Sequence, residues 1–371
     1  MKVPQFMPYV DMEDYKALKE SFEMNWITEG PKSKEFDKKL REKTNTSFGS
    51  FAPNGTLALY LALRAAGIGK GDEVIVPNFT FIATANAVEM TGAKPVFADI
   101  DSKTFQLDPN ACHSLISSRT KAIMPAHLYG FCANMDEIKR FARSYSLLVI
   151  EDAAQALGIE WDGKPCGSFG DIACFSFFAD KTITTAEGGF VTTNNEKYAE
   201  QLLYLRNQGR INRGSFIHPE IGYNFRMTDL QSSLGLSQLK KFDKIVKLKR
   251  EIHSLYTELL SDVEEVKITQ PCEKITSFIP FRVVLQVEED SSEGLMTYMT
   301  EKEIEPRTFF YPLHMQPCFK RYIKSWKYWR YSFKNSETAY NKGVCLPSYA
   351  ALTEEQVHHV CDTIKDYYVR G

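Results

Sequence analysis

The chain has 371 residues and a formal net charge of −2, and its composition is 43% hydrophobic and 25% charged. This length allows a large buried core and two or three domains. The composition excludes a disordered, fibrous or membrane protein. Lys and Arg are interleaved with Asp and Glu instead of forming a basic stripe, so we expect no nucleic-acid partner.

No run approaches the roughly 18 consecutive apolar residues of a membrane span. The segment from Met1 to Phe6 lacks the apolar core of a signal peptide. We therefore expect a cytoplasmic protein without a membrane partner. The eight cysteines lie far apart without a Cys-x-x-Cys pair, so we expect reduced core residues and no metal site.

The first predicted element is an amphipathic helix from Asp11 to Met24, which ends before a loop with Gly and Pro at residues 26–31. From there to about Thr193, strand-like apolar runs alternate with helix-like segments. The predicted strands are Glu73–Val76, Pro95–Ala98, Ala122–Pro125, Leu147–Ile150, Ile172–Phe177 and Phe190–Thr193, and the predicted helices include Thr56–Ala66, Ala83–Thr91 and Met135–Tyr145. This alternation predicts an α/β fold with a mostly parallel sheet covered by helices on both faces.

The apolar spacing becomes helical from Thr228 to Leu260, and a helix of that length suits a bridge between two domains. A smaller α/β segment follows, with a predicted strand at Ile279–Leu285 and a closing helix at Glu354–Tyr368. We therefore predict a large domain over residues 1–240. The bridging helix and a small C-terminal α/β domain make up residues 241–371.

Lys181 follows the strand predicted to end at Phe177, and small residues, hydroxyl residues and a Gly-Gly pair separate it from the next strand. Ligands of parallel sheets bind at the carboxyl ends of the strands. Partial desolvation at that edge would lower the pKa of the amine and make it a Schiff-base nucleophile. The alternative is a solvated loop lysine, which is the usual case for a lysine taken alone.

An upstream apolar strand delivers Asp152 at its carboxyl end, and Gln155 follows one turn later. Pyridoxal phosphate requires a carboxylate against its pyridine nitrogen, because a proton on that nitrogen makes the ring an electron sink. We predict that Asp152 takes this role and that Gln155 donates to the phenolic oxygen. A carboxylate that only caps a helix is the alternative for Asp152.

A phosphate site is predicted where Gly55 and Thr56 open a helix, because backbone N–H groups at a helix start are free to bind an anion. Ser176, near the end of the strand before Lys181, adds a hydroxyl. An ordinary turn followed by a helix cap is the alternative for the Asn-Gly-Thr sequence.

These features resemble, over nearly the whole chain, the sugar aminotransferases of the DegT/DnrJ/EryC1/StrS group, which are fold type I pyridoxal-phosphate enzymes. The matching segments are residues 26–31, 54–56, 71–77, 80–84, 151–155, the Lys181 loop with 187–189, and 222–229. The resemblance implies that Lys181 forms the Schiff base with the cofactor and shuttles protons, while Asp152 pairs with the pyridine nitrogen. It also assigns the phosphate to Gly55, Thr56 and Ser176.

The same resemblance implies that Phe81 stacks on the cofactor ring and that Asn224 reaches the phosphate of the neighbouring subunit. The protein would then be a homodimer with two shared active sites. From the residues alone, Phe81 would be interpreted as a core residue and Asn224 as a turn residue.

The substrate is predicted from two further segments. Residues 307–317 resemble the branch that makes GDP-perosamine and related 4-amino sugars, and residues 225–229 match enzymes that act at C4. We therefore predict transamination of a nucleotide-linked 4-keto-6-deoxyhexose, with L-glutamate as donor and pyridoxamine phosphate formed during turnover. The product would be a 4-amino-4,6-dideoxy sugar for a surface polysaccharide. Residues predicted near the substrate are Glu187, Arg226, Tyr311 and His314.

Two departures from related 4-aminotransferases precede the lysine and Glu187. This chain has Ala179-Asp180 where relatives often have Gly-Asn, and Ala186 where they often have Gly. A carboxylate close to Lys181 would favour the charged amine, but we expect Asp180 to point elsewhere in the turn. The alternatives are a 3-aminotransferase and a non-catalytic regulatory or nucleotide-sugar-binding protein. A sugar dehydratase of the same fold would carry histidine in place of Lys181.

Overall fold

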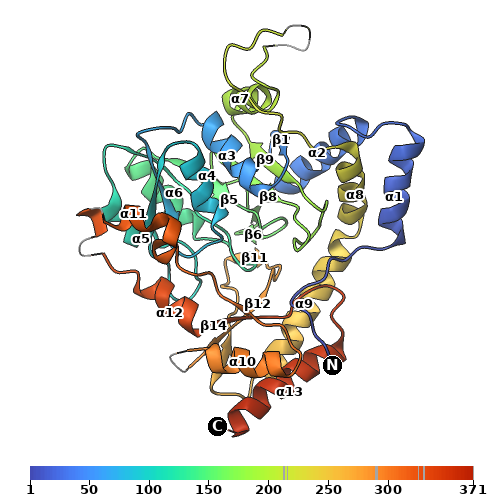
Figure 1. Cartoon of the computed structure of the whole chain (residues 1–371), viewed down its shortest axis with the longest axis vertical. Helices are drawn as coiled ribbons and strands as arrows, with labels where there is room; N and C mark the ends of the chain where they lie inside the picture. The colour runs from blue at the N-terminus through green and yellow to red at the C-terminus, as the bar shows by residue number, and fades with distance from the viewer. Residues whose placement is uncertain (212–213, 215, 289–290, 325, 329–330, 371) are drawn as a thin grey trace.

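The fold is described from a computed structural model, which covers residues 1–211, 214, 216–288, 291–324, 326–328 and 331–370. Its centre is a seven-stranded sheet with strand order β1-β9-β8-β5-β4-β2-β3 (Figure 1). The strands are β1 Phe48–Ala52, β2 Glu73–Pro77, β3 Lys94–Ala98, β4 Thr120–Ile123, β5 Leu148–Asp152, β8 Ile172–Ser176 and β9 Gly189–Thr193. Strands β3, β2, β4, β5 and β8 are parallel, and β9 runs antiparallel to both of its neighbours, β8 and β1.

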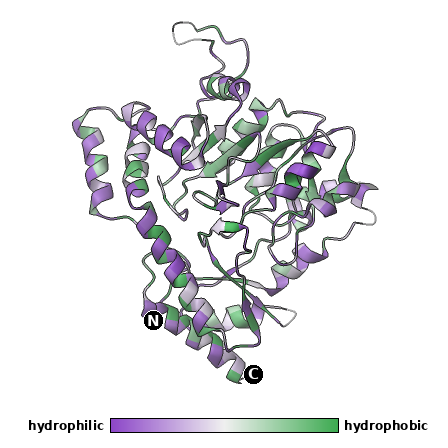
Figure 2. Ribbon diagram, turned by 180° about the vertical axis from the view of Figure 1, so that it is seen from behind, coloured by the Kyte–Doolittle hydropathy of each residue, from purple (hydrophilic) through white to green (hydrophobic). Residues whose placement is uncertain are grey.

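Helices surround this sheet. They are α1 Met12–Glu23, α2 Pro31–Thr44, α3 Gly55–Ala65, α4 Ala83–Met90, α5 Pro109–Cys112, α6 Met135–Ser144 and α7 Glu196–Arg206. Helix α3 contacts β8 and β9, α4 contacts β2 and β3, and α6 contacts β5. The strands are mostly hydrophobic, whereas the outer helices mix hydrophilic and hydrophobic residues (Figure 2). The prediction of an α/β fold with a mostly parallel sheet is therefore confirmed.

A second, antiparallel sheet has the order β10-β12-β14-β13. Its strands are β10 Val266–Ile268, β12 Val283–Val287, β13 Arg307–Thr308 and β14 Gly343–Leu346, and its helices include α9 Phe242–Leu259, α10 Glu293–Glu301, α12 Lys334–Lys342 and α13 Glu354–Arg370. A hydrophobic core separate from that of the large sheet joins this sheet to α9 and α13. Helix α9 begins close to the boundary predicted at residue 240, and the division into two domains stays a prediction.

Short elements complete the described chain. A three-stranded sheet joins β6 Glu160–Trp161, β7 Lys164–Pro165 and β11 Ile275–Ser277, and α11 Lys320–Ile323 and four 3-10 turns (η1 His113–Leu115, η2 Leu313–Met315, η3 Pro317–Phe319, η4 Trp326–Tyr328) lie in connections. The N-terminal segment packs on the small sheet. Val3 pairs with Ile304, and the side-chain amide of Gln5 donates to the carbonyl of Cys345 at 3.0 Å.

The single bridging helix predicted over residues 228–260 was wrong, because the helix breaks at Lys241. Helix α8 (Asp229–Lys240) packs on α1 and α2, whereas α9 packs on α13. Lys241 lies between them with its amine 2.5 Å from Asp14 and 3.0 Å from Asp11. The helices α8 and α9 therefore pack against different parts of the molecule.

Other predicted bounds were close to the observed elements. The strand expected at Ala122–Pro125 lies two residues earlier, as β4, and the strand expected at Ile279–Leu285 begins only at Val283. Of the eight cysteines expected in the core, Cys272 and Cys318 are exposed, and all eight are free.

Candidate active site

A cavity of about 380 Å³ opens where the carboxyl ends of the parallel strands face the small sheet. Its walls come from the turns after β1, β2, β4, β5 and β8 and from residues beside β12, β13 and β14. The lining includes Asn54, Gly55, Thr56, Thr80, Phe81, His127, Tyr129, Asp152, Gln155, Ser176, Asp180, Lys181, Glu187, Phe281, Arg282, Arg307, Phe310 and Cys345. The topology thus gathers side chains from distant segments at one edge of the sheet, as expected for a parallel sheet.

Lys181 lies in the loop between β8 and β9, which is held by backbone bonds such as Thr185 N–H to Phe177 O at 3.0 Å. Its side chain is only 15% exposed, and its amine lies 4.6 Å from the centre of the Phe281 ring. Burial lowers the pKa of Lys181, while the negative charge of Asp180 opposes the shift. A buried amine that loses its proton more readily has the property predicted for a Schiff-base nucleophile.

Asp180 does not point away from the lysine, so that expectation was wrong. One carboxylate oxygen of Asp180 lies 3.5 Å from the Lys181 amine, and the other accepts a bond of 2.7 Å from Arg282. The Arg282 side chain is 3% exposed. The Arg282 guanidinium therefore partly neutralises the negative charge of Asp180. As a result, Asp180 raises the pKa of Lys181 less than it would alone.

Asp152 is the last residue of β5 and is buried. The hydroxyl of Thr84 donates to one of its oxygens at 2.7 Å, and the N–H of Ala154 donates to the other at 3.2 Å. Burial raises the pKa of Asp152, and the bond from Thr84 works against that rise. A buried carboxylate in an apolar setting is stabilised by a cationic partner, and the cavity has room for one.

Gly55, Thr56 and Ser176 meet at one end of the cavity, where α3 begins beside the end of β8. Asn54 caps α3, because its side-chain oxygen accepts the N–H of Leu57 at 3.0 Å. A Cβ at position 55 would lie 2.8 Å from the Cβ of Ser176. Only glycine therefore leaves open the space between Gly55, Thr56 and Ser176, which we call the Gly55 cradle. Free N–H groups, a hydroxyl and a helix N-terminus together suit a phosphate.

Phe81, Gln155 and Glu187 also line the cavity. Phe81 is 58% exposed, which is unusual for a large aromatic residue inside a fold and leaves its ring free to cover a ligand. The side-chain oxygen of Gln155 accepts the N–H of Tyr129 at 2.8 Å, so its amide group is oriented with the nitrogen available as a donor.

The other predicted site residues lie outside the cavity lining of this chain. Asn224 is exposed, and its backbone pairs with that of Asn207 in an isolated β-bridge. The guanidinium of Arg226 donates to the side-chain oxygen of Asn207 at 2.8 Å. Tyr311 packs edge to face on another tyrosine. His314 bonds with Asn78 and lies 3.1 Å from Glu337, and it stacks on an aromatic ring. For His314 these contacts are those of a structural residue.

The roles of three residues in or next to the cavity were missed from the sequence. Thr84, in the first turn of α4, was interpreted as part of a helix and of the matching segment 80–84, and its bond to Asp152 was not predicted. Arg282 and Arg307 lie beside short strands of the small sheet, and only the folded chain brings them to Lys181. The signal that could have found Arg282 is a charged residue next to the apolar run of β12, since a buried arginine requires an anionic partner.

His127 lies beneath the cavity with both ring nitrogens in use. Its Nε2 lies 3.0 Å from the buried carboxylate of Glu151, and its Nδ1 accepts the N–H of Ala133 at 3.1 Å. Cys132 and Cys166 lie within 4.8 Å of this ring, forming a buried polar cluster behind β5.

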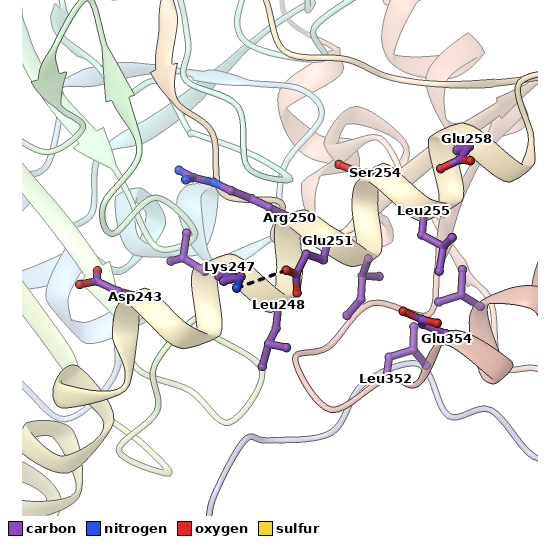
Figure 3. A pocket seen from close by; sticks show the side chains of 13 residues that line it. Asp243, Lys247, Leu248, Arg250, Glu251, Ser254, Leu255, Glu258, Leu352 and Glu354 are labelled. Carbon is purple, nitrogen blue, oxygen red and sulfur yellow. Dashed lines mark ion pairs between the residues drawn. The ribbon is translucent and has the colours of Figure 1, made fainter.

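A larger hollow, of about 760 Å³, lies elsewhere, along the outer side of α9 (Figure 3). Its lining combines apolar residues such as Leu255 and Leu352 with charged residues, among which Lys247 and Glu251 form an ion pair of 3.7 Å. Most of these side chains follow one another along α9, and the rest come from the start of α13 and the turn before it, so the charged groups do not converge on a common point. We therefore place the candidate active site in the smaller cavity around Lys181.

Comparison with known proteins shows the family of the chain. The model of the DegT/DnrJ/EryC1/StrS aminotransferase family matches residues 8–365. The chain belongs to this family. Among its relatives, the GDP-perosamine synthase of Escherichia coli O157:H7 is 36% identical over 367 residues, covering 99% of this chain and 98% of that protein. The GDP-perosamine synthase of Caulobacter vibrioides is 38% identical and covers 95% of each chain.

Solved structures of family members have the same fold. The aminotransferase TlmJ of Streptoalloteichus hindustanus superposes with a TM-score of 0.93 at 25% identity, covering 100% of both chains. The family, fold and enzyme-class predictions are therefore confirmed, and the chain is an aminotransferase. Within the described residues, none of the helices has the length and apolar character needed to span a membrane.

Proposed function

We propose that this chain is a pyridoxal-phosphate-dependent aminotransferase that acts on a nucleotide-linked 4-keto-6-deoxyhexose. The observation that carries the proposal is the convergence of Lys181, Asp152 and the Gly55 cradle in one cavity. A structure described as a sugar aminotransferase, Spr1654 of Streptococcus pneumoniae in its PLP-form, superposes over this whole chain with a TM-score of 0.92 at 26% identity. The same cofactor therefore fits this family member.

The cavity residues match the polar groups of pyridoxal phosphate one by one. Gly55, Thr56 and Ser176 would hold the phosphate, and Asp152 would face the pyridine nitrogen. The raised pKa of Asp152 reflects burial without a cationic partner, which a protonated pyridine would supply. Gln155 would donate to the phenolic oxygen. Further supporting these roles, Phe81 leaves one ring face free above the same space.

When bound, the cofactor supplies an electron-withdrawing ring that stabilises the negative charge left after a proton leaves the substrate carbon. In the resting enzyme the amine of Lys181 would hold the cofactor aldehyde. Once the amino group of the donor has displaced it, the free amine would take that proton and return it during transfer of the amino group. Thr84 orients Asp152, so that the carboxylate keeps the ring nitrogen protonated. Apolar walls such as Phe281 and Phe310 exclude water from Lys181.

The amino donor in this proposal is L-glutamate, and the product is a perosamine-like 4-amino-4,6-dideoxy sugar used in surface polysaccharides. Relatives in E. coli, Vibrio cholerae and Caulobacter, which are named GDP-perosamine synthase, support this choice at 34–38% identity. Glu187 is the predicted substrate residue that lines the cavity of the same chain. We also place the enzyme in the cytoplasm, where nucleotide sugars are made.

A homodimer with shared active sites forms part of the proposal. Asn224 is exposed on a segment outside its own cavity, where it can reach a second subunit. The same segment projects beyond α7 (Figure 1) and carries apolar side chains that a partner would cover. These are Ile211, Phe216, Ile217 and Ile221, each at least 66% exposed.

The test is to locate the cofactor. Reduction of the holoenzyme with borohydride, followed by peptide mass mapping, should place the pyridoxyl group on Lys181. The matched control is Lys249, which is also buried and has a pKa lowered by burial to about 7. The variant Lys181→Ala should lose the bound-aldehyde absorbance and about 10⁴-fold or more of the turnover rate. Labelling of Lys249 instead, or an active Lys181→Ala enzyme, would overturn the assignment.

A further inference from the structure

Arg282 is held in an unusual position for an arginine, below the cavity and directly before β12. Its side chain is 3% exposed, and its guanidinium lies 4.4 Å from the centre of the Phe281 ring. One terminal nitrogen, Nη2, donates to Asp180 at 2.7 Å. Asp180 and the aromatic ring therefore fix the plane of the guanidinium before any substrate arrives.

The second terminal nitrogen of Arg282 has no such partner. Its Nη1 is buried and makes no hydrogen bond among the described residues, although Arg282 lines the cavity. An unsatisfied buried donor destabilises the fold, and more so when it is charged. A donor left open at this cost, beside the candidate catalytic lysine, indicates a ligand that completes it.

The charges around this donor favour an anion. Arg307, in the same cavity wall, adds a second permanent positive charge, and the amines of Lys181 and Lys249 lie close to Arg282. Against them this part of the cavity has the single carboxylate of Asp180, whose free oxygen also lacks a hydrogen-bond partner. A second carboxylate at Nη1 would balance the excess and form a charge-assisted bond.

The proposed reaction involves two anionic groups, the α-carboxylate of the amino donor and the diphosphate of the nucleotide sugar. The position of Arg282 distinguishes between them. Asp180 connects it to the Lys181 amine, through contacts of 2.7 and 3.5 Å. The α-carboxylate of an amino acid is one bond from the carbon that carries the amino group. The diphosphate of a nucleotide sugar lies on the far side of the sugar ring from C4. The group near the lysine is therefore the carboxylate.

We propose that Arg282 is a specificity residue that binds the α-carboxylate of the amino donor through Nη1, while Asp180 positions it through Nη2. The inference rests on the proposed aminotransferase function and adds the subsite for the donor. It also gives Asp180 a role, as the residue that orients Arg282 beside the lysine.

The experiment follows each half-reaction separately by absorbance, in holoenzyme. The pyridoxal form is mixed with L-glutamate, and the pyridoxamine form with a nucleotide 4-keto sugar. The tested variant is the double substitution Asp180→Asn with Arg282→Gln, which removes both charges together and leaves no buried ion unpaired. The glutamate concentration at half-maximal rate should rise about 10- to 100-fold, as for loss of one charge-assisted hydrogen bond. The increase for the keto sugar should be at least ten-fold smaller.

Two comparisons sharpen the result. Arg282→Lys keeps a charge but loses the planar pair of donors, so it should fall between the wild type and the double variant. Wild-type enzyme should prefer L-glutamate over L-isoglutamine, whose α-carboxylate is an amide, and the double variant should lose most of this preference. An unchanged glutamate dependence would overturn the proposal, as would a loss confined to the sugar half-reaction. A wild-type holoenzyme that did not respond to glutamate would contradict the proposed function instead.

Discussion

The cavity around Lys181 and the hollow along α9 differ in size and in organisation. The hollow along α9 is about twice as large, 760 against 380 Å³, yet most of its charged groups lie in line along one helix, where Lys247 and Glu251 pair at the surface. In the cavity, side chains from five turns of one sheet and from the small sheet point to a common space. Convergence of buried, unpaired groups therefore identifies the site, and volume does not.

The largest expected effect tests the buried carboxylate of the cavity. Asp152→Ala should lower the turnover rate by about 10²- to 10³-fold, because removing one partner of a buried ion pair costs about 3–5 kcal/mol. Cofactor affinity and turnover would be measured on the same preparation. A loss of less than about ten-fold would contradict the pairing of this residue with the ring nitrogen.

A smaller effect concerns Lys249, a buried lysine of α9 whose amine lies 3.4 Å from the carbonyl of Phe281. Burial lowers its pKa to about 7, against about 10.4 in an unfolded chain. The unfolded chain thus holds one more proton between these values, so this residue makes the wild type more stable as pH rises from 7 to 10. Lys249→Met should raise the free energy of unfolding by about 1–4 kcal/mol at pH 6, and by less at pH 9.

Urea unfolding of both proteins at pH 6, 7.5 and 9 would measure this difference. A stability gain that stayed constant over the three pH values would show that Lys249 is not a neutral amine in the folded state.

A smaller effect is expected from backbone strain in the loop that carries Lys181, the candidate catalytic lysine. Ala186 has a φ of +65°, in the left-handed region that favours glycine. Ala186→Gly should therefore stabilise the protein by about 1 kcal/mol, less the entropy that glycine adds to the unfolded chain. Thermal unfolding would detect the gain, and a lower midpoint would contradict the strain.

The smallest effect is expected in the hollow along α9. Replacing Lys247 and Glu251 by alanine removes an exposed ion pair of 3.7 Å. The free energy of unfolding should change by less than about 0.5 kcal/mol, and activity should stay within the error of the assay. A marked loss of activity would show that this hollow takes part in the reaction after all.

Sequence patterns located the cofactor end of the cavity because its residues directly follow buried strands. Asp152 and Ser176 end apolar runs, and Gly55 opens an amphipathic helix, so their neighbours in sequence indicate their place. Arg282 gave no such signal. Its partner Asp180 lies 102 positions earlier, and only the packing of the small sheet against the large one joins them.

The break at Lys241 was hidden for a related reason. The apolar spacing continues through it, and the change of direction depends on what each half packs against. The positions of Asn224 and Arg226 outside the cavity likewise concern a surface of the molecule, which local patterns do not describe.

The first residues of the chain form part of the wall beside the candidate donor site. The ring of Phe6 lies 5.7 Å from the guanidinium of Arg282 and 5.9 Å from that of Arg307, and the bond of Gln5 to the small sheet holds this segment there. A purification tag would therefore disturb the enzyme least at the C-terminal end. Trimming the N-terminus back past Phe6 would remove an aromatic neighbour of both arginines, expose the buried Arg282 to water and weaken its binding of small carboxylic acids.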